Sequence, residues 1–311
     1  MKIVIPEKID VIPEKYFNEL NKFGKVVYHT DFPNDHEIII NRIKDAELLI
    51  VKWVYLPTDF LDYCPKLRYI VSLTSGFGHF PLIDARKKGV TIVNSPTHNS
   101  LAVAEHTIAL MFAVSRKITF ARDNILKGNW KISPYDFLGT ELSGKTLLQV
   151  GNGNIGSKVA KIARGIGMKV VVSNSKTTDD QLDKLIPTSD LISINVPLTN
   201  RTKNMMNERR IGLMKSSAYL INTARGDIVD QNALYKALKN RNIAGAGLDV
   251  FPGTLPTGKA NREVVILARL SNVVATPHMA FNTIEAGERL GREMVDNVKS
   301  ILTGKPINVV N

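Results

Sequence analysis

Short apolar runs alternate with amphipathic helical patterns along almost the whole chain. Apolar runs bounded by turn residues are typical of buried strands, and apolar positions spaced three and four apart predict helices between them. Regular alternation of strand and helix predicts an α/β protein with parallel sheets. In the first third, strands are expected at Lys2–Ile5, Val26–Tyr28, Glu47–Val51, Tyr69–Leu73 and Thr91–Asn94, and helices at Glu14–Phe23, His36–Ile43, Asp59–Tyr63 and Leu82–Lys88.

A second series of strands and helices follows a long apolar-periodic stretch from Ser100 to about Lys127. We expect that stretch to be one long helix connecting two domains, because 311 residues are too many for one hydrophobic core. The later strands are expected at Thr146–Val150, Lys169–Ser173, Leu191–Ile194, Ala218–Ile221, Ala244–Asp249 and Val273–Ala275, with helices at Ile155–Ile166, Gln181–Ile186, Gln231–Lys239 and Thr283–Thr303.

The strand Thr146–Val150 runs directly into a turn that contains Gly151, Gly153 and Gly156. A glycine turn between a strand and a helix is the context in which a G-x-G-x-x-G pattern binds a dinucleotide. The first glycine permits a tight turn, the second lets backbone N–H groups approach a pyrophosphate, and the third lets the helix pack on the strand. The sequence therefore predicts nucleotide binding, although glycines also mark ordinary turns.

Composition limits the classes of partner. The formal net charge is +12, but the basic residues are scattered, so we expect mostly solvated surface that aids anion capture and no nucleic-acid binding. Cys64 is the single cysteine, which excludes an intramolecular disulfide and a cysteine metal site. No apolar stretch is long enough to span a membrane, and the N-terminus resembles a strand rather than a signal peptide. These features predict a cytoplasmic protein that does not bind membranes.

Three chemically useful residues follow strands of the second series, where a doubly wound domain places its ligands. Arg225 can pair with a carboxylate through two parallel hydrogen bonds, and His278 can move a proton near neutral pH. Asp249 ends the strand between them. Singly, each has a structural explanation as a surface charge, a loop residue or a turn cap. Together they favour a site, and no His, Asp or Glu spacing suggests a metal.

The chain resembles the D-isomer-specific 2-hydroxyacid dehydrogenase family over nearly its whole length. The resemblance is carried by several segments in the family's order: Pro65–Gly89, Val103–Leu110, the glycine turn, Val196–Thr199, Asn222–Asp227, Gly247–Phe251 and Thr276–His278. It implies a flavodoxin-like substrate domain of residues 1–98 plus 283–311. A Rossmann dinucleotide-binding domain of residues 99–282 would be inserted in it, and the protein would be a homodimer.

The resemblance also implies roles for individual residues. Arg225 would bind the substrate carboxylate and keto oxygen, His278 would be the acid/base, and Asp249 would hold the nicotinamide carboxamide. Backbone N–H groups of Ser75 and Gly76 would hold the carboxylate, with Lys52 near that pocket. The cofactor would lie against Gly151, Gly153, Asn154, Ile155, Gly156, Asn174, Ser175, Lys176, Val196, Pro197, Thr202, Thr223, Ala224, Asp249 and His278.

Two positions depart from the family's pattern. The family's catalytic Glu falls on Thr254, which cannot supply the carboxylate that would raise the pKa of His278. Three explanations are open for the missing Glu. The enzyme works with the Arg–His pair alone, Glu263 from the following segment takes the place of the Glu, or the protein is catalytically weak. Asn174 occupies the place of the acid that binds the ribose in NAD-preferring domains, and Ser175 with Lys176 could bind a 2′-phosphate. The sequence therefore favours NADP over NAD.

Together these features predict an NAD(P)-dependent enzyme that interconverts a small 2-keto acid and a D-2-hydroxy acid by hydride transfer. A weak or inactive NAD(P)-binding sensor of the same fold is one alternative. A dehydrogenase of another small anion, such as phosphite or formate, is the other.

Overall fold

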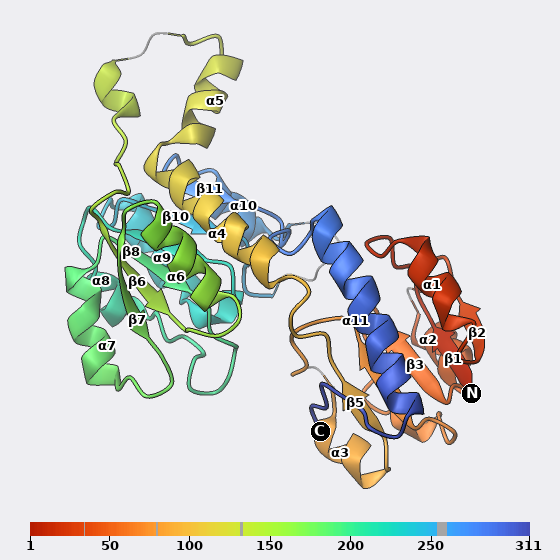
Figure 1. The fold of residues 1–311 in the computed structure, drawn as a ribbon. Coiled ribbons are helices and arrows are strands. Elements are labelled where there is room, and N and C mark those ends of the chain that lie inside the picture. The colour runs from red at the N-terminus through yellow and green to blue at the C-terminus, as the bar shows by residue number, and fades with distance from the viewer. Residues whose placement is uncertain (34, 79, 131–132, 254–259) are drawn as a thin grey trace. The chain divides into compact units, whose positions relative to one another are not determined.

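The computed structural model describes residues 1–33, 35–78, 80–130, 133–253 and 260–311. The chain divides into two compact units: Met1–Asn99 with Asn282–Asn311, and Ser100–Phe281. Both borders lie one residue from the ranges predicted above. Each unit contains one parallel sheet flanked by helices (Figure 1), which confirms the α/β fold class with a Rossmann-type second unit.

The sheet of the first unit has five parallel strands in the order β2-β1-β3-β4-β5. All five lie at or within a residue or so of the predicted ranges. They are β1 (Lys2–Ile5), β2 (Lys25–Tyr28), β3 (Leu48–Val51), β4 (Tyr69–Ser72) and β5 (Thr91–Val93), accompanied by α1 (Glu14–Leu20), α2 (His36–Ile43), η1 (Phe60–Asp62) and α3 (Leu82–Lys87).

The last helix, α11 (Ile284–Leu302), belongs to this first unit and packs on α1. Thr283 caps its N-terminus by accepting a hydrogen bond from Ala286 N–H. Its buried face includes Leu290, Met294 and Val298, which join the core on that side of the sheet.

The sheet of the second unit has six strands in the order β11-β10-β9-β8-β6-β7. Its strands are β6 (Thr146–Val150), β7 (Lys169–Ser173), β8 (Leu191–Ile194), β9 (Tyr219–Asn222), β10 (Gly245–Leu248) and β11 (Val273–Ala275). The predicted helices are present as α6 (Gly156–Gly165), α7 (Asp179–Leu185) and α9 (Gln231–Lys239). Because β7 and β8 pair with β6 on opposite sides, the strand order reverses at β6, and its carboxyl end is where such sheets bind ligands.

The single long helix expected from Ser100 to Lys127 is wrong. Lys117 adopts a left-handed backbone with φ 55°, which separates α4 (Ser100–Ser115) from α5 (Ile118–Leu126). A left-handed residue cannot continue a right-handed helix. Moreover, α4 does not connect two domains but lies in the second unit, packed on β9, β10 and α6.

Two short helices were not expected from the sequence. They are α8 (Glu208–Gly212) and α10 (Arg262–Ala268). Each is too short to show a clear apolar period, but each begins after an asparagine, Asn207 or Asn261, whose side chain accepts a hydrogen bond from the first turn. Among the described helices, none is long and apolar enough to cross a membrane.

Candidate functional site

The glycine turn at the end of β6 has the geometry that a dinucleotide requires. Gly151 has φ 95°, and a Cβ there would lie 2.3 Å from the Asn195 carbonyl oxygen. A Cβ on Gly156 would lie 2.1 Å from the Gly151 carbonyl oxygen. Both positions therefore require glycine for reasons internal to the protein.

Gly153 differs, because a Cβ there would meet nothing within 4 Å. Its backbone N–H has no acceptor among the described residues, and α6 begins three residues later. An open space beside a backbone donor and a helix N-terminus fits a pyrophosphate, since both favour negative charge. The turn therefore fits the phosphates of a dinucleotide cofactor, with Gly153, Asn154 and Ile155 lining it.

The loop after β7 is a tight turn built by Asn174. The Asn174 side-chain oxygen accepts a hydrogen bond from Lys176 N–H (2.9 Å), and Asn174 N–H donates to Thr177 Oγ1 (3.0 Å). Asn174, Ser175 and Lys176 are exposed at this turn. The turn thus presents a hydroxyl and an ammonium group next to the glycine turn, with no carboxylate at residue 174.

The loop after β8 lies on the other side of β6. Thr202 Oγ1 donates to the Pro197 carbonyl oxygen (2.6 Å), which closes the segment into a turn. Arg201, which the sequence analysis did not single out, reaches from this loop to the β7 loop. Its Nη1 and Nη2 donate to the carbonyl oxygens of Ser175 (3.3 Å) and Thr177 (3.1 Å).

Arg225, Asp249 and His278 follow three neighbouring parallel strands, β9, β10 and β11. They therefore lie at one edge of the sheet, as predicted. Arg225 keeps exposed surface and its Nη1 donates to the Ala224 carbonyl oxygen (2.7 Å). Protein atoms crowd the guanidinium itself, and the resulting desolvation lowers its pKa from the ordinary value. Nearby, the Thr223 hydroxyl is buried and bonded to Thr107 Oγ1 (2.8 Å), so Thr223 faces the protein interior.

Asp249 holds the turn that carries His278. The Asp249 carboxylate is 1% exposed and accepts hydrogen bonds from Thr276 Oγ1 (2.6 Å), Met279 N–H (3.0 Å) and Ala280 N–H (3.0 Å). His278 N–H donates to the Asp249 carbonyl oxygen (2.9 Å), and the His278 backbone is left-handed with φ 51°. A histidine held in this conformation is a strained position that the surrounding bonds must maintain. Contact of Asp249 with a nicotinamide stays a prediction.

His106 extends this network from α4. Its Nε2 lies 3.0 Å from Thr276 Oγ1 and 3.6 Å from Asp249 Oδ1. Because the Thr276 hydroxyl donates to Asp249, it accepts from His106. The sequence offers no spacing that links residues 106 and 276, so this part of the site was not predicted. The His278 ring itself packs edge-on against Phe281, with ring centroids 5.8 Å apart.

In the first unit, Lys52 follows β3 and is nearly buried. Its ammonium donates to the Leu73 carbonyl oxygen (3.3 Å) and lies 4.4 Å from the centre of the Trp53 ring. The fully buried Glu7 carboxylate accepts hydrogen bonds from the backbone N–H groups of Lys52, Trp53 and Val54 at 2.7–3.0 Å. Burial lowers the pKa of Lys52 to about 8, while the charge of Glu7 opposes that shift.

The loop after β4 contains Ser75 and Gly76. Thr74 Oγ1 donates to the Gly76 carbonyl oxygen (2.6 Å), and Asn94 Nδ2 donates to that of Ser75 (2.9 Å). These bonds fix the loop through its carbonyl groups. The N–H groups of Ser75 and Gly76 have no acceptor among the described residues, so they are available to an anion.

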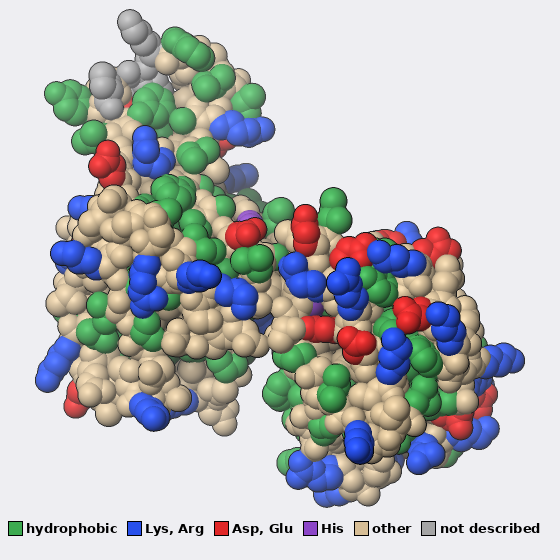
Figure 2. All heavy atoms as spheres, in the orientation of Figure 1, with side chains coloured by type: hydrophobic (Ala, Val, Ile, Leu, Met, Phe, Trp, Pro, Cys, Tyr) green, Lys and Arg blue, Asp and Glu red, His purple; other side chains and the backbone are tan. Residues whose placement is uncertain are grey.

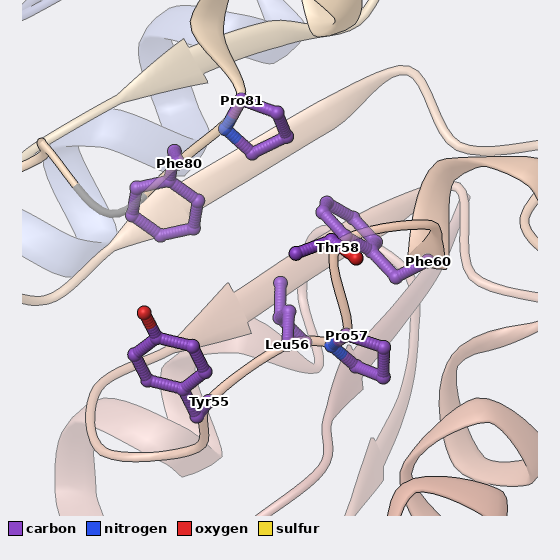
Figure 3. A pocket seen from close by; sticks show the side chains of 7 residues that line it. All are labelled: Tyr55, Leu56, Pro57, Thr58, Phe60, Phe80 and Pro81. Carbon is purple, nitrogen blue, oxygen red and sulfur yellow. The ribbon is translucent and has the colours of Figure 1, made fainter.

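A cavity of about 170 Å³ opens at the same edge of the first sheet. In Figure 3, Phe80 and Pro81 line one side and Tyr55, Leu56, Pro57, Thr58 and Phe60 line the other. None of the described residues that line it carries a carboxylate, amine, guanidinium or imidazole. It therefore does not offer a small anion the charge that the neighbouring Lys52 and Ser75–Gly76 segments offer.

Thr254 lies outside the described residues, so its relation to His278 stays as the sequence predicts it. Glu263, the alternative acid, is exposed in the first turn of α10, where it accepts a hydrogen bond from Gln231 Nε2 (3.3 Å). This bond connects the Glu263 carboxylate, on α10, with the first residue of α9.

A glycine turn at the strand reversal, with Arg225, Asp249 and His278 at the ends of three other strands of the same sheet, is typical of a dinucleotide-dependent oxidoreductase. The family model for the D-isomer specific 2-hydroxyacid dehydrogenase NAD-binding domain matches residues 108–280. A glyoxylate reductase of Thermofilum pendens is 38% identical, over 97% of this chain and 92% of that protein.

Solved structures of related enzymes have the same fold. An acyclic imino acid reductase, in complex with NADPH and D-Arg, superposes with a TM-score of 0.89 at 34% identity, covering 100% of both chains. A D-lactate dehydrogenase of Aquifex aeolicus, complexed with NAD and lactic acid, gives a TM-score of 0.82 at 32% identity, covering 98% of this chain and 96% of that one. The chain belongs to the D-isomer specific 2-hydroxyacid dehydrogenase family. It is an oxidoreductase of 2-hydroxy acids that uses a nicotinamide dinucleotide.

Proposed function

We propose that this enzyme reduces a small 2-keto acid to the D-2-hydroxy acid, with NADP(H) as its preferred cofactor. The observation that carries the proposal is the placement of Arg225, Asp249 and His278 at the carboxyl ends of three adjacent strands. The same edge of the sheet carries the glycine turn that fits a dinucleotide. When bound, the nicotinamide supplies or accepts the hydride at the substrate's C2.

Arg225 binds and orients the substrate in this proposal. Its planar guanidinium pairs with a carboxylate through two bonds and polarises the keto oxygen, which lysine cannot do in the same geometry. The N–H groups of Ser75 and Gly76 and the ammonium group of Lys52 bind the carboxylate as well. Four groups that favour negative charge explain selection of a small anionic acid.

His278 donates a proton to the keto oxygen during reduction and accepts it back during oxidation. The Asp249 carboxylate acts on His278 through the backbone of the 276–280 turn, so Asp249 is a positioning residue. With Thr254 at the place of the family's Glu, we propose that Arg225 and His278 work without a catalytic carboxylate. A carboxylate introduced by Thr254→Glu is then expected to move the fall of kcat/KM for reduction to higher pH. Superimposable pH profiles would remove this explanation.

The cofactor preference rests on the β7 loop. The Asn174 side-chain oxygen is used inside its own turn, and no negative charge at residue 174 repels a 2′-phosphate. NADPH is the cofactor named for the imino acid reductase and NAD for the D-lactate dehydrogenase, so relatives with either are known. Glyoxylate and hydroxypyruvate are the first substrates to test, since reductases of each are among the relatives.

A 340 nm assay separates this function from its alternatives. Wild-type protein is tested with NADPH and NADH on glyoxylate, hydroxypyruvate and pyruvate, with and without ammonium, and with NADP⁺ and NAD⁺ on phosphite and formate. NADPH-dependent reduction of a keto acid alone supports the proposal. Turnover that needs ammonium indicates an imino acid substrate, turnover of phosphite or formate indicates the other dehydrogenase class, and tight cofactor binding without turnover indicates a sensor.

We also propose that the protein is a homodimer assembled through the arm of the second unit, by which we mean the described residues 116–130 and 133–138. The arm exposes large apolar side chains: Ile118, Ile125, Leu126, Trp130, Tyr135 and Leu138. Figure 2 shows hydrophobic side chains gathered over α5 and the segment after it. Several large exposed apolar side chains on one arm are typical of a protein–protein interface. The cytoplasmic location and the lack of nucleic-acid or membrane partners stay predictions.

A further inference from the structure

We propose that Arg201 is a third contact for the 2′-phosphate of NADP(H), together with Ser175 and Lys176. This inference rests on the NADP(H) use proposed above and adds a residue from a different strand to that subsite. An arginine in the loop after β8 would then set cofactor specificity jointly with the loop after β7.

The first argument is the position of the guanidinium. Arg201 extends from the β8 loop and donates to the carbonyl oxygens of Ser175 (3.3 Å) and Thr177 (3.1 Å), on either side of Lys176. β6 lies between β7 and β8 in the sheet. Arg201 therefore joins the two loops that flank the glycine turn, where the adenosine half of a dinucleotide lies in a Rossmann-type domain.

The second argument is the shape of the β7 turn. Asn174 forms the turn through its own side chain, and Thr177 N–H donates to the Asn174 carbonyl oxygen (3.0 Å). The Asn174 side-chain oxygen thus uses one of its two lone pairs inside the turn, and as a neutral amide it does not repel a phosphate. The turn gathers the Ser175 hydroxyl, the Lys176 residue and the Arg201 guanidinium within one short stretch of backbone.

The third argument is charge. A guanidinium has five N–H donors, and two of the Arg201 nitrogens each donate to one carbonyl oxygen, which leaves three donors for a ligand. Neither Arg201 nor Lys176 forms an ion pair with a described acidic residue. The nearest acid in sequence, Asp179, pairs with Arg210 at 2.9 Å, and Asp180 follows it on α7. A turn that carries Lys176 and is bonded by the Arg201 guanidinium brings two positively charged residues to one loop, which favours binding of a dianion such as a 2′-phosphate.

An arginine at this place has one other plausible use, which is to stack on the adenine ring. Stacking would serve NADPH and NADH equally, because the two cofactors differ only by the 2′-phosphate. Contact with that phosphate serves NADPH alone. The ratio of the two affinities therefore decides between the two roles, independently of catalysis.

Isothermal titration calorimetry with NADPH and with NADH tests the inference on the whole protein. The variants are Arg201→Met, which removes the charge, and Arg201→Lys, which keeps the charge without the planar fork. Arg269→Met is the matched control, because Arg269 is also an exposed arginine of the second unit. Arg269 directly follows α10, and α10 packs on β11, at the opposite edge of the sheet from β7.

Wild type is expected to bind NADPH more tightly than NADH. Arg201→Met is expected to raise the Kd for NADPH at least about tenfold, which corresponds to about 1.4 kcal/mol of binding free energy. The Kd for NADH is expected to change less than about twofold. The Kd of Arg201→Lys for NADPH is expected to lie between those of wild type and Arg201→Met, and the Kd of Arg269→Met to equal that of wild type. An unchanged Kd for NADPH in Arg201→Met, or equal loss for both cofactors, overturns the role of Arg201 while NADP(H) use stands. Tighter binding of NADH by wild type overturns the NADP(H) proposal itself.

Discussion

Glu7 and Lys52 place two buried charges of opposite sign at the ends of neighbouring strands, β1 and β3. The Glu7 carboxylate accepts hydrogen bonds from the backbone N–H groups of residues 52–54. These bonds fix the segment from which the Lys52 side chain extends. Desolvation raises the pKa of Glu7, and the three backbone N–H bonds and the Lys52 charge oppose that shift. Glu7 therefore fixes the segment 52–54 from inside the first unit, and Lys52 in turn bonds to the Leu73 carbonyl oxygen just after β4.

If Lys52 binds the substrate as proposed, substrate binding should depend on pH. Its pKa of about 8 lies below the ordinary value, so the ammonium form is present below about pH 8 and is lost as the pH rises through it. Since the charged form attracts an anionic substrate, KM for the keto acid is expected to rise above about pH 8 in wild type. Lys52→Arg, charged throughout, is expected to flatten this rise, and Lys52→Met to raise KM several-fold at pH 7. Measured KM values from pH 6.5 to 9.5 check this. A wild-type KM that stays flat to pH 9.5 would exclude Lys52 from substrate binding.

At the scale of single elements, the turn between β6 and α6 separates two reasons for a glycine. Gly156 is required by packing, since its Cβ would overlap the Gly151 carbonyl oxygen. Gly153 is not required by packing, because its Cβ would point into open space. Its requirement comes from the ligand instead, since a pyrophosphate must approach the backbone closely there.

Alanine substitutions at these two positions should therefore separate stability from cofactor binding. Gly156→Ala is expected to lower the free energy of unfolding by about 1–3 kcal/mol or more, the usual cost of overpacking. Gly153→Ala is expected to change it by less than about 0.5 kcal/mol but to weaken NADPH binding at least about tenfold. Urea denaturation and calorimetric titration measure the two quantities. Normal cofactor affinity in Gly153→Ala would show that the phosphates bind elsewhere.

Most strands and several helices were predictable because apolar periodicity and glycine or cap residues mark them locally. The break at Lys117 was not, since nothing in the residues around it forbids a continuous helix. Similarly, Arg225, Asp249 and His278 were found because each follows a strand. The contacts of His106 with Thr276, of Glu7 with the segment 52–54, and of Arg201 with the β7 loop join distant parts of the sequence, so no local pattern reveals them.

At the scale of the whole molecule, the arm of the second unit is the strongest indication of assembly. α5 has no buried residue, and Trp130 and Tyr135 are 83% and 82% exposed. Figure 1 shows α5 and the segment after it extending away from the sheet of their own unit. We propose that a second copy of the chain covers these apolar side chains, which their own unit leaves exposed.

Charge placed on the arm should therefore dissociate the dimer. The double variant Leu126→Glu/Leu138→Glu is expected to be a folded monomer at micromolar concentration, because burying two carboxylates in an apolar interface costs several kcal/mol. Ile83→Glu is the control, since Ile83 on α3 is 73% exposed but lies outside the arm. Light scattering after size exclusion gives the masses. A wild-type monomer, or a double variant that stays dimeric, would rule out assembly through the arm.

Arg225 and His278 are proposed to carry out keto acid reduction together, beside the dinucleotide site. Single-turnover reduction of glyoxylate, followed through NADPH fluorescence in wild type, Arg225→Met and His278→Gln, tests it most directly. Hydride transfer is expected to be about 10²–10⁴ times slower in His278→Gln and similarly reduced in Arg225→Met, with NADPH affinity nearly unchanged. Hydride transfer at the wild-type rate in either variant would contradict the account.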